Sequence, residues 1–184
     1  SVLRELEKNM DGYQNSVRAV MRAAGARRLR GVLGPVSTIL KVEPGCEVAI
    51  ETALGGALQN IVVENEAAAK AAIALLRNDH AGRATFLPLD TVQPGAFRGR
   101  LSGTARLASA LVQADPRYEN IVSNLLGRII VVEDINEASR VARDNGYHNK
   151  VVTMDGQVIN AGGSFTGGSV QRSAGLFTRK QEME

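Results

Sequence analysis

The sequence predicts an α/β (α+β) fold made of two similar mixed α/β halves. The main reason is a degenerate repeat: residues 49–88 and 121–154 each contain a helix pattern, a glycine, an apolar strand, a second helix and a second strand. Composition agrees, because 44% of the residues are hydrophobic, only 4% are aromatic and none is Trp. Such a core of Val, Ile, Leu and Ala suits helices packed on a sheet, and 184 residues can bury it without disulfides.

Each element of the repeat has a local signal. Gly55 and Gly127 are placed to end the first helix of each copy, and the strands that follow are continuously apolar, as expected of strands covered on both faces. Asn65 and Asp134 are N-cap residues, and Asp134 with Glu137 has the pattern of a capping box. Units of this kind recur in many α/β proteins, and the fold class is the same if the repeat is only such a recurrence. The predicted elements are helices at 49–54, 66–77, 121–126 and 135–145, and strands at 61–63, 84–88, 129–132 and 150–154.

Both ends of the chain have helical character. Leu3, Leu6 and Met10 recur at spacings of three and four between charged residues, and residues 179–184 are charged and helix-prone. Neither end carries a residue that would stop a helix, so we interpret the chain as an excerpt of a larger protein with helical arms. The expected division is an N-terminal arm at 1–12, a first half at 13–100, a second half at 101–173 and a C-terminal arm at 174–184, with a loop at 91–103 joining the halves.

A glycine-rich motif follows a predicted β-hairpin near the end of the second half. Two apolar stretches, 151–154 and 157–160, flank Asp155-Gly156, a pair typical of a two-residue type I′ turn. The motif then places two glycine pairs around one aromatic residue, which predicts a close approach of the backbone by a ligand or by another main chain. The hypothesis of a phosphate loop lacks the Lys that follows such loops, so we favour an exposed strand edge that pairs with a second chain. The candidate interface residues are Gly162, Gly163, Ser164, Phe165, Thr166, Gly167 and Gly168.

No pattern of catalytic or metal-ligating residues emerges from the sequence. Cys46 is the single cysteine, which suggests a reducing compartment, and it has no His near it in sequence. His80 and His148 lie far apart and lack partners at zinc-ligand spacing, so we predict no metal site. Ser164 and Thr166 have no nearby base and are interpreted as turn or strand hydroxyls. We therefore expect no catalytic residue and no cofactor in this chain.

The charge pattern permits a polyanion partner without requiring one. The formal net charge is +3, and arginines cluster at 27–30, between 77 and 106, and after the glycine motif. No apolar run approaches the length of a membrane span, and the N-terminus does not resemble a signal peptide. We therefore expect a cytoplasmic protein with no membrane partner.

Four motifs are distinctive: residues 49–63 (AIETALGGALQNIVV), 82–90 (GRATFLPLD), 124–127 (NLLG) and 158–169 (VINAGGSFTGGS). With these motifs the chain resembles the hinge domain of structural maintenance of chromosomes (SMC) proteins, in its bacterial form. The resemblance covers nearly the whole chain. It implies antiparallel coiled-coil arms that lead to distant ATPase heads, where kleisin-type subunits bind. It also implies a two-fold homodimer in which the glycine-rich strand meets the first half of the partner, and association with the nucleoid.

The same resemblance implies a role in binding DNA. In the hinge family, basic residues near the dimer interface and the coiled-coil junction are implicated in DNA contact, and we carry this over to Arg77, Arg172, Arg179 and Lys180. Backbone-directed contacts of this kind read no sequence and weaken with salt. This chain has Gln171-Arg172-Ser173 where many bacterial relatives have consecutive lysines, so the expected binding is weak. No Walker motif lies in these residues, so ATPase activity would belong to heads outside the chain.

The favoured function is thus a dimerisation hinge with auxiliary DNA contact. The alternative is a small-molecule or nucleotide-binding α/β domain whose glycine motif cradles a phosphate, and saturable heat on addition of nucleotides would distinguish it. A hydrolase built on residues 164–166 is a third hypothesis, disfavoured for want of a general base.

Overall fold

The computed structural model describes residues 13–169 and Phe177. The chain forms two compact units, unit 1 from Ser1–Ile39 and Gly56–Val92 and unit 2 from Leu40–Gly55 and Gln93–Glu184. The chain therefore crosses between the units three times. The predicted arms at 1–12 and 174–184 lie, apart from Phe177, outside the described residues.

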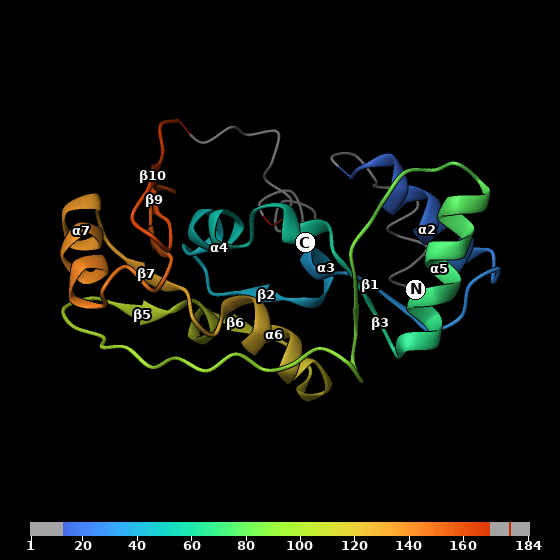
Figure 1. Cartoon of the computed structure of the whole chain (residues 1–184), viewed down its shortest axis with the longest axis horizontal. Helices are drawn as coiled ribbons and strands as arrows, with labels where there is room; N and C mark the ends of the chain where they lie inside the picture. Colours follow the sequence, from blue (N-terminus) through green and yellow to red (C-terminus); the bar gives the residue numbers. More distant parts are fainter. Residues whose placement is uncertain (1–12, 170–176, 178–184) are drawn as a thin grey trace. The chain divides into compact units, whose positions relative to one another are not determined.

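Unit 1 is a three-stranded sheet with two long helices (Figure 1). The strand order is β1-β3-β4, in which β1 is antiparallel to β3 and β4 is parallel to it. The apolar faces of α2 and α5 pack together and against this sheet, around Val20, Met21 and Ala72. The elements are α2 (Asn15–Gly25), β1 (Val32–Pro35), α3 (Val36–Ile39), the 3-10 helix η1 (Gly55–Gln59), whose first residue belongs to unit 2, β3 (Ile61–Val63), α5 (Glu66–Asn78) and β4 (Phe86–Pro88).

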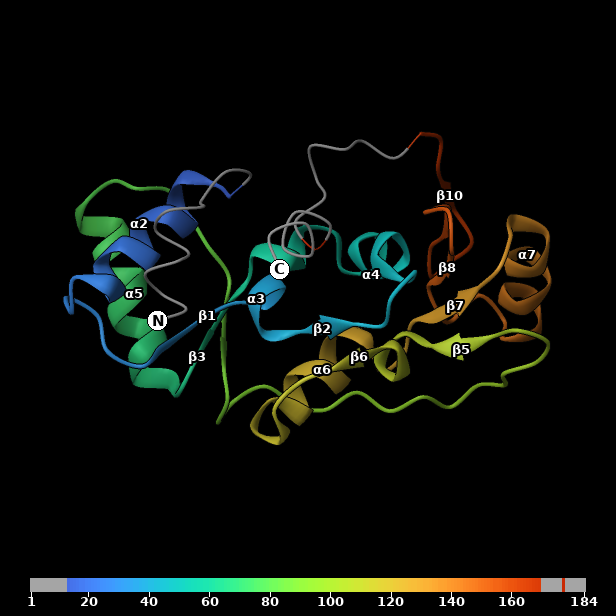
Figure 2. The same cartoon turned by 180° about the vertical axis from the view of Figure 1, so that it is seen from behind.

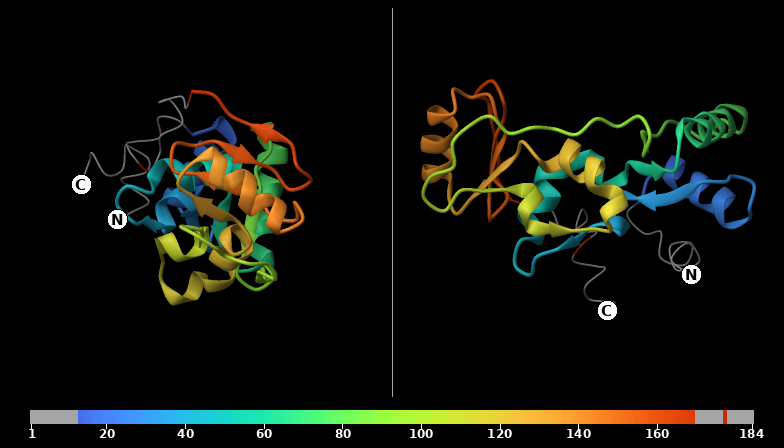
Figure 3. Two further views of the ribbon diagram at one scale, coloured as in Figure 1. Left: turned by 90° about the vertical axis from the view of Figure 1, so that its left-hand side faces the viewer. Right: turned by 90° about the horizontal axis from the view of Figure 1, so that it is seen from below.

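Unit 2 is built on a five-stranded sheet of order β10-β9-β8-β7-β5, with a separate two-stranded sheet of β2 and β6. Helix α7 covers one face of the five-stranded sheet (Figure 3), where Val141 and Ala142 pack on Ile130, Val151 and Ile159. The elements are β2 (Lys41–Val42), α4 (Glu47–Leu54), β5 (Arg106–Leu107), η2 (Ala108–Leu111), β6 (Val112–Gln113), η3 (Pro116–Tyr118), α6 (Glu119–Leu126), β7 (Ile130–Val132), α7 (Ile135–Asp144), β8 (Val151–Thr153), β9 (Val158–Ile159) and β10 (Phe165–Thr166).

The segment 40–55 packs in unit 2, although the sequence division places it in the first half. The physical reason is its pairing: β2 forms an antiparallel ladder with β6, and α4 contacts β8, α6 and η2. The sequence also places residues 93–100 in the first half, whereas in the structure they belong to unit 2.

The predicted repeat is confirmed. The first copy is α4, β3, α5 and β4, and the second is α6, β7, α7 and β8, in the same order along the chain. Each copy contains a parallel pair, with Ile61 opposite Phe86 in the first and Ile130 opposite Val151 in the second. An antiparallel strand flanks each pair, β1 beside β3 and β5 beside β7, so the repeat extends one strand further than the sequence suggested.

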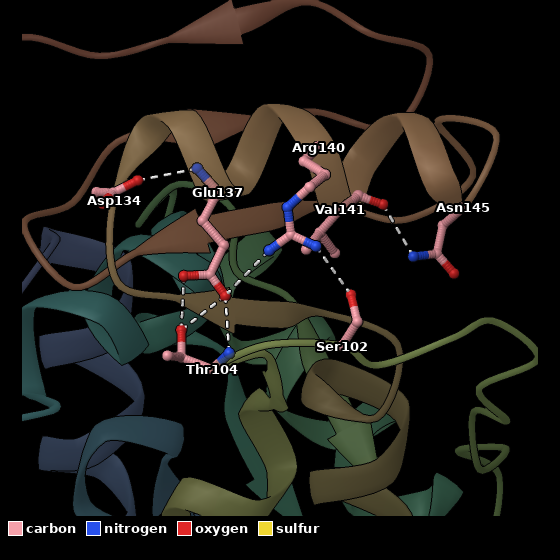
Figure 4. Close-up of polar contacts among 7 residues, drawn as sticks. All are labelled: Ser102, Thr104, Asp134, Glu137, Arg140, Val141 and Asn145. Carbon is pink, nitrogen blue, oxygen red and sulfur yellow. Dashed lines mark hydrogen bonds and ion pairs between the residues drawn. The ribbon is translucent and has the colours of Figure 1, made fainter.

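Both predicted N-caps are present, but the capping box is not formed as predicted. The Asn65 side chain accepts from the Ala68 N–H, and the Asp134 Oδ1 atom accepts from the Glu137 N–H at 2.9 Å. Instead of returning to the Asp134 N–H, the Glu137 carboxylate accepts from the N–H and the hydroxyl of Thr104, at 2.8 and 2.7 Å (Figure 4). A tertiary partner has replaced the local one, which ties the loop before β5 to the start of α7.

The hairpin of β8 and β9 forms, but its turn differs from the prediction. The Gly156 N–H donates to the Thr153 carbonyl at 3.0 Å, and the Thr153 N–H donates to the Gln157 carbonyl at 2.9 Å, so the loop holds three residues. A type I′ turn requires positive φ at both central residues, and here Gly156 has a φ of +88° while Asp155 has no positive φ. The predicted type I′ turn is therefore wrong, and Gly156 serves a three-residue loop.

The predicted loop joining the halves has no helix or strand over residues 93–105, and we call this segment the strap (Figure 2). Side chains of unit 2 hold its main chain along its length. The Ser123 hydroxyl donates to the Gly95 carbonyl at 2.7 Å, and Asn124 donates to the Gln93 carbonyl at 2.9 Å. Further along, Asn145 bonds both main-chain groups of Arg100. The strap is thus a fixed part of unit 2.

Candidate dimer edge and basic surface

The first glycine pair of the motif forms a tight turn between β9 and β10. The Gly163 N–H donates to the Asn160 carbonyl at 2.9 Å, and Gly162 and Gly163 have φ values of +91° and +100°. L side chains rarely adopt this backbone conformation. The glycines at these two positions are therefore explained by the turn itself.

The second glycine pair is held by one side chain. The Gln157 amide accepts from the Gly168 N–H at 2.8 Å and donates to the Gly168 carbonyl at 3.0 Å. A Cβ at Gly167 would overlap the Gln157 side-chain oxygen, and Gly168 has a φ of +128°. Since turn geometry and Gln157 account for both glycine pairs, the alternative of a nucleotide-binding domain whose glycine backbone cradles a phosphate is not favoured.

The hydroxyl groups in the motif are bound by an amide. The Asn160 Nδ2 group donates to the Ser164 hydroxyl at 3.2 Å and to the Thr166 hydroxyl at 3.0 Å. An amide NH₂ donates hydrogen bonds and cannot take up a proton as a general base does. These contacts give Ser164 and Thr166 a structural role in the hairpin.

Strand β10 leaves main-chain groups open at the edge of the five-stranded sheet. The Asn160 N–H donates to the Ser164 carbonyl at 2.7 Å, so this pair is hydrogen-bonded and the next pair, Ile159 with Phe165, is not. The N–H and carbonyl of Phe165 therefore point away from β9. Its side chain is 60% exposed, the largest value among the exposed large hydrophobic residues that the structure describes.

Unit 1 has a matching open edge at β4. The Ile61 N–H donates to the Thr85 carbonyl at 2.9 Å, and the Leu89 N–H donates to the Val63 carbonyl at 3.0 Å, so these residues of β4 and its flanks face β3. Alternation along the strand then turns the N–H and carbonyl of Phe86 outward. The sequence reading did not identify this edge, because a three-residue strand with Pro88 gives no pairing signal of its own.

Arg77 lies at the exposed C-terminal end of α5, near other arginines. It belongs to the last turn of that helix, and Arg28 pairs with Asp79 just beyond it at 3.7 Å. Arg27 and Arg30 flank Arg28 and are also exposed. The C-terminal end of α5 thus presents two arginines, which we call the α5-end cluster (Arg28 and Arg77). The other predicted DNA contacts, Arg172, Arg179 and Lys180, lie outside the described residues.

The surroundings of Cys46, His80 and His148 do not indicate a catalytic or metal-binding role. Cys46 is buried, its thiol donates to a Glu43 carboxylate oxygen at 3.4 Å, and burial together with this carboxylate raises the pKa of the thiol. A raised pKa keeps the sulfur protonated at neutral pH and unreactive as a nucleophile. His80 and His148 are both exposed. Over residues 13–169 and 177, no group of three or more His, Cys, Asp or Glu could hold a metal ion, and no helix is long and apolar enough to cross a bilayer.

Comparison with known proteins identifies the family. Residues 29–142 match the family model described as "SMC proteins Flexible Hinge Domain". The chain belongs to the SMC hinge family. Among solved structures, this SMC hinge resembles the asymmetric hinge dimer from Geobacillus stearothermophilus, with a TM-score of 0.87 and 37% identity over 98% of this chain and 75% of that one. The hinge domain of Pyrococcus furiosus SMC gives a TM-score of 0.72 and 27% identity over 91% of this chain and 86% of that one.

The curated relatives are much longer proteins. This SMC hinge is 38% identical over 190 residues to the chromosome partition protein Smc of Desulfitobacterium hafniense, which covers 99% of the chain and 16% of the relative. The corresponding protein of Bacillus subtilis is 36% identical over 191 residues, covering 100% of the chain and 16% of the relative. The predicted two-half α/β hinge fold is thereby confirmed.

Proposed function

We propose that this SMC hinge forms a two-fold homodimer in which β10 of one protomer adds to the open edge of β4 in the other. The observation that carries the proposal is that no strand of the described residues pairs with the outer edge of β10 or of β4, where Phe165 and Phe86 present main-chain groups outward. Open edges are a liability unless another chain pairs with them, and strand addition satisfies both at once.

The repeat indicates why β4 is the acceptor strand. Strand β4 corresponds to β8, and β8 carries the antiparallel strand β9 on its outer side. Among the described residues of unit 1, no strand takes the equivalent place beside β4. A strand from a second copy would complete unit 1 as the hairpin completes unit 2. In a two-fold dimer the contact occurs twice, since each copy supplies one β10 and one β4.

The mass of the chain in solution tests the dimer. Light scattering behind a sizing column should give about 39 kDa, twice the chain mass of 19.6 kDa. A mass of 19.6 kDa at micromolar concentration would remove the dimer and the strand pairing with it.

DNA contact is the second part of the proposed function. The α5-end cluster supports it, because exposed guanidinium groups bind phosphates and release counterions without reading sequence. Arg172, Arg179 and Lys180 remain candidate contacts. In the complete protein, the hinge would join coiled-coil arms to ATPase heads and kleisin-type subunits in the nucleoid.

Replacement of Arg77 by Glu should weaken duplex DNA binding several-fold and lower the salt slope of the affinity by about 1 for each phosphate that the variant no longer binds. Fluorescence anisotropy at several salt concentrations measures both quantities. Arg143→Glu is a matched control, since Arg143 is also exposed in the last turn of a helix but lies in unit 2. Equal losses in the two variants would mean that net charge, rather than the α5-end cluster, governs binding.

A further inference from the structure

A polar cavity of about 330 Å³ lies in unit 2, beside the glycine-rich edge. Thr52 of α4, Lys150 before β8, and Asn160, Thr166 and Ser169 of the motif supply its polar side chains. None of the described residues that line it is acidic. Its polar lining thus carries one formal charge, the ammonium of Lys150.

Lys150 is half-buried at the start of the segment that leads into β8. Its Nζ donates one hydrogen bond, to the Ala53 carbonyl at 3.0 Å, while an ammonium has three donors. Within the described ranges 13–169 and 177, no carboxylate pairs with it within 4.0 Å. Burial accordingly lowers the pKa of Lys150, and no carboxylate of the described residues offsets this effect. A cation in this position is costly until an anion joins it.

The protons that Lys150 and the neighbouring hydroxyls can donate suit a ligand that accepts hydrogen bonds. Asn160, Thr166 and Ser169 line the cavity. The Asn160 NH₂ group donates to the Thr166 hydroxyl, whose own proton can be given to a ligand. The Thr52 hydroxyl gives its proton to the Val48 carbonyl at 2.7 Å, so it has no proton left for a ligand. A metal cation would be repelled by the ammonium, and a neutral ligand would leave the charge uncompensated. An oxyanion accepts charge-assisted hydrogen bonds and neutralises it.

We propose that this cavity binds an oxyanion, a carboxylate or phosphate group, with Lys150 as its charge partner. Two sources present this chemistry. One is a free inorganic anion, and the other is a carboxylate side chain of a second copy that docks along β10, a version that rests on the proposed dimer. In either case the anion would neutralise the charge of Lys150 directly beside β10. Binding of the anion in the cavity and pairing of β10 with a second copy should therefore affect each other.

Titration of the whole chain with inorganic phosphate tests the first source. Calorimetry should show saturable binding to the wild type, weakened about 10-fold or more in Lys150→Met and largely retained in Lys150→Arg. Lys41→Met is the matched control, because Lys41 is exposed on β2 of the same unit and lies outside the cavity. As an independent readout, phosphate should raise the pKa of Lys150 in a ¹⁵N-lysine NMR titration, a change that a purely structural lysine would not show.

Dilution of the dimer tests the second source. If a partner carboxylate fills the cavity, phosphate does not bind the dimer, and Lys150→Met raises the dimer dissociation constant about 10-fold or more while Lys41→Met and Lys150→Arg leave it nearly unchanged. Absence of phosphate binding together with an unchanged dissociation constant in Lys150→Met overturns the proposal. A wild-type chain that is monomeric but binds phosphate through Lys150 would refute the dimer and support the oxyanion site, so the two proposals fail separately.

Discussion

Phe165→Glu should convert the dimer into a folded monomer. Phe165 is 60% exposed within one chain, so the protomer loses little packing, while a charge at the centre of the proposed β10 contact must be desolvated in both copies of the interface. Losses at central aromatic residues commonly exceed 2 kcal/mol, which is about 30-fold for one contact. Because the contact occurs twice in the dimer, we expect the dissociation constant to rise by about 100-fold or more. Light scattering should report 19.6 kDa at concentrations where the wild type gives about twice that mass.

Phe165→Glu tests the interface more specifically than replacement of the glycines of the motif. Gly163 and Gly168 have φ values of +100° and +128°, so a side chain there would strain the protomer as well as the interface. Ile73→Glu is the matched control, because Ile73 is a large hydrophobic residue that is 47% exposed and belongs to helix α5 rather than to either edge strand. A dimeric Phe165→Glu chain with native circular dichroism would exclude β10 from the interface.

Asn145→Ala should lower the free energy of unfolding by about 2–3 kcal/mol. The Asn145 side chain is buried and makes three hydrogen bonds: it accepts from the Arg100 N–H at 2.7 Å and donates to the Arg100 and Val141 carbonyls at 3.0 and 2.9 Å. Alanine would leave both main-chain groups of Arg100 without these partners. Urea denaturation followed by circular dichroism measures the change.

Asn124→Ala provides the comparison. Its amide also holds the strap, but through one exposed bond to the Gln93 carbonyl at 2.9 Å, so a loss below about 1 kcal/mol is expected. Similar losses in the two variants would show that the buried, three-bond anchor at Asn145 is no more important than a single surface bond.

Local signals predicted the repeat and its helix ends well. Asn65 and Asp134 cap the helices they precede, because an N-cap bond spans only three residues and tolerates any tertiary setting. The capping box failed for the opposite reason, since Glu137 found a partner in Thr104, which is 33 positions away. Contacts at such separation leave no spacing pattern in a single sequence.

Two further features lay beyond sequence reasoning. The placement of 40–55 in unit 2 depends on the pairing of β2 with β6, two strands of two residues each, too short to show an alternation. Lys150 directly precedes a buried strand and lines the cavity. Its place in the sequence does not reveal whether its side chain is exposed or lines a cavity. The glycine-rich edge, in contrast, was located from sequence, because positive φ angles restrict the residue type to glycine. Its role in dimerisation remains a prediction.

The three crossings between the units bear on how this hinge would carry force. The described chain starts in unit 1 and finishes in unit 2, so tension pulling its ends apart passes from one unit to the other. After Ile39, Gly55 and Val92 the backbone crosses, which gives three covalent connections that share the load while both units stay folded. A single proteolytic cut at one crossing would leave two connections intact. The halves of the hinge are thus tethered more securely than two domains joined by one linker.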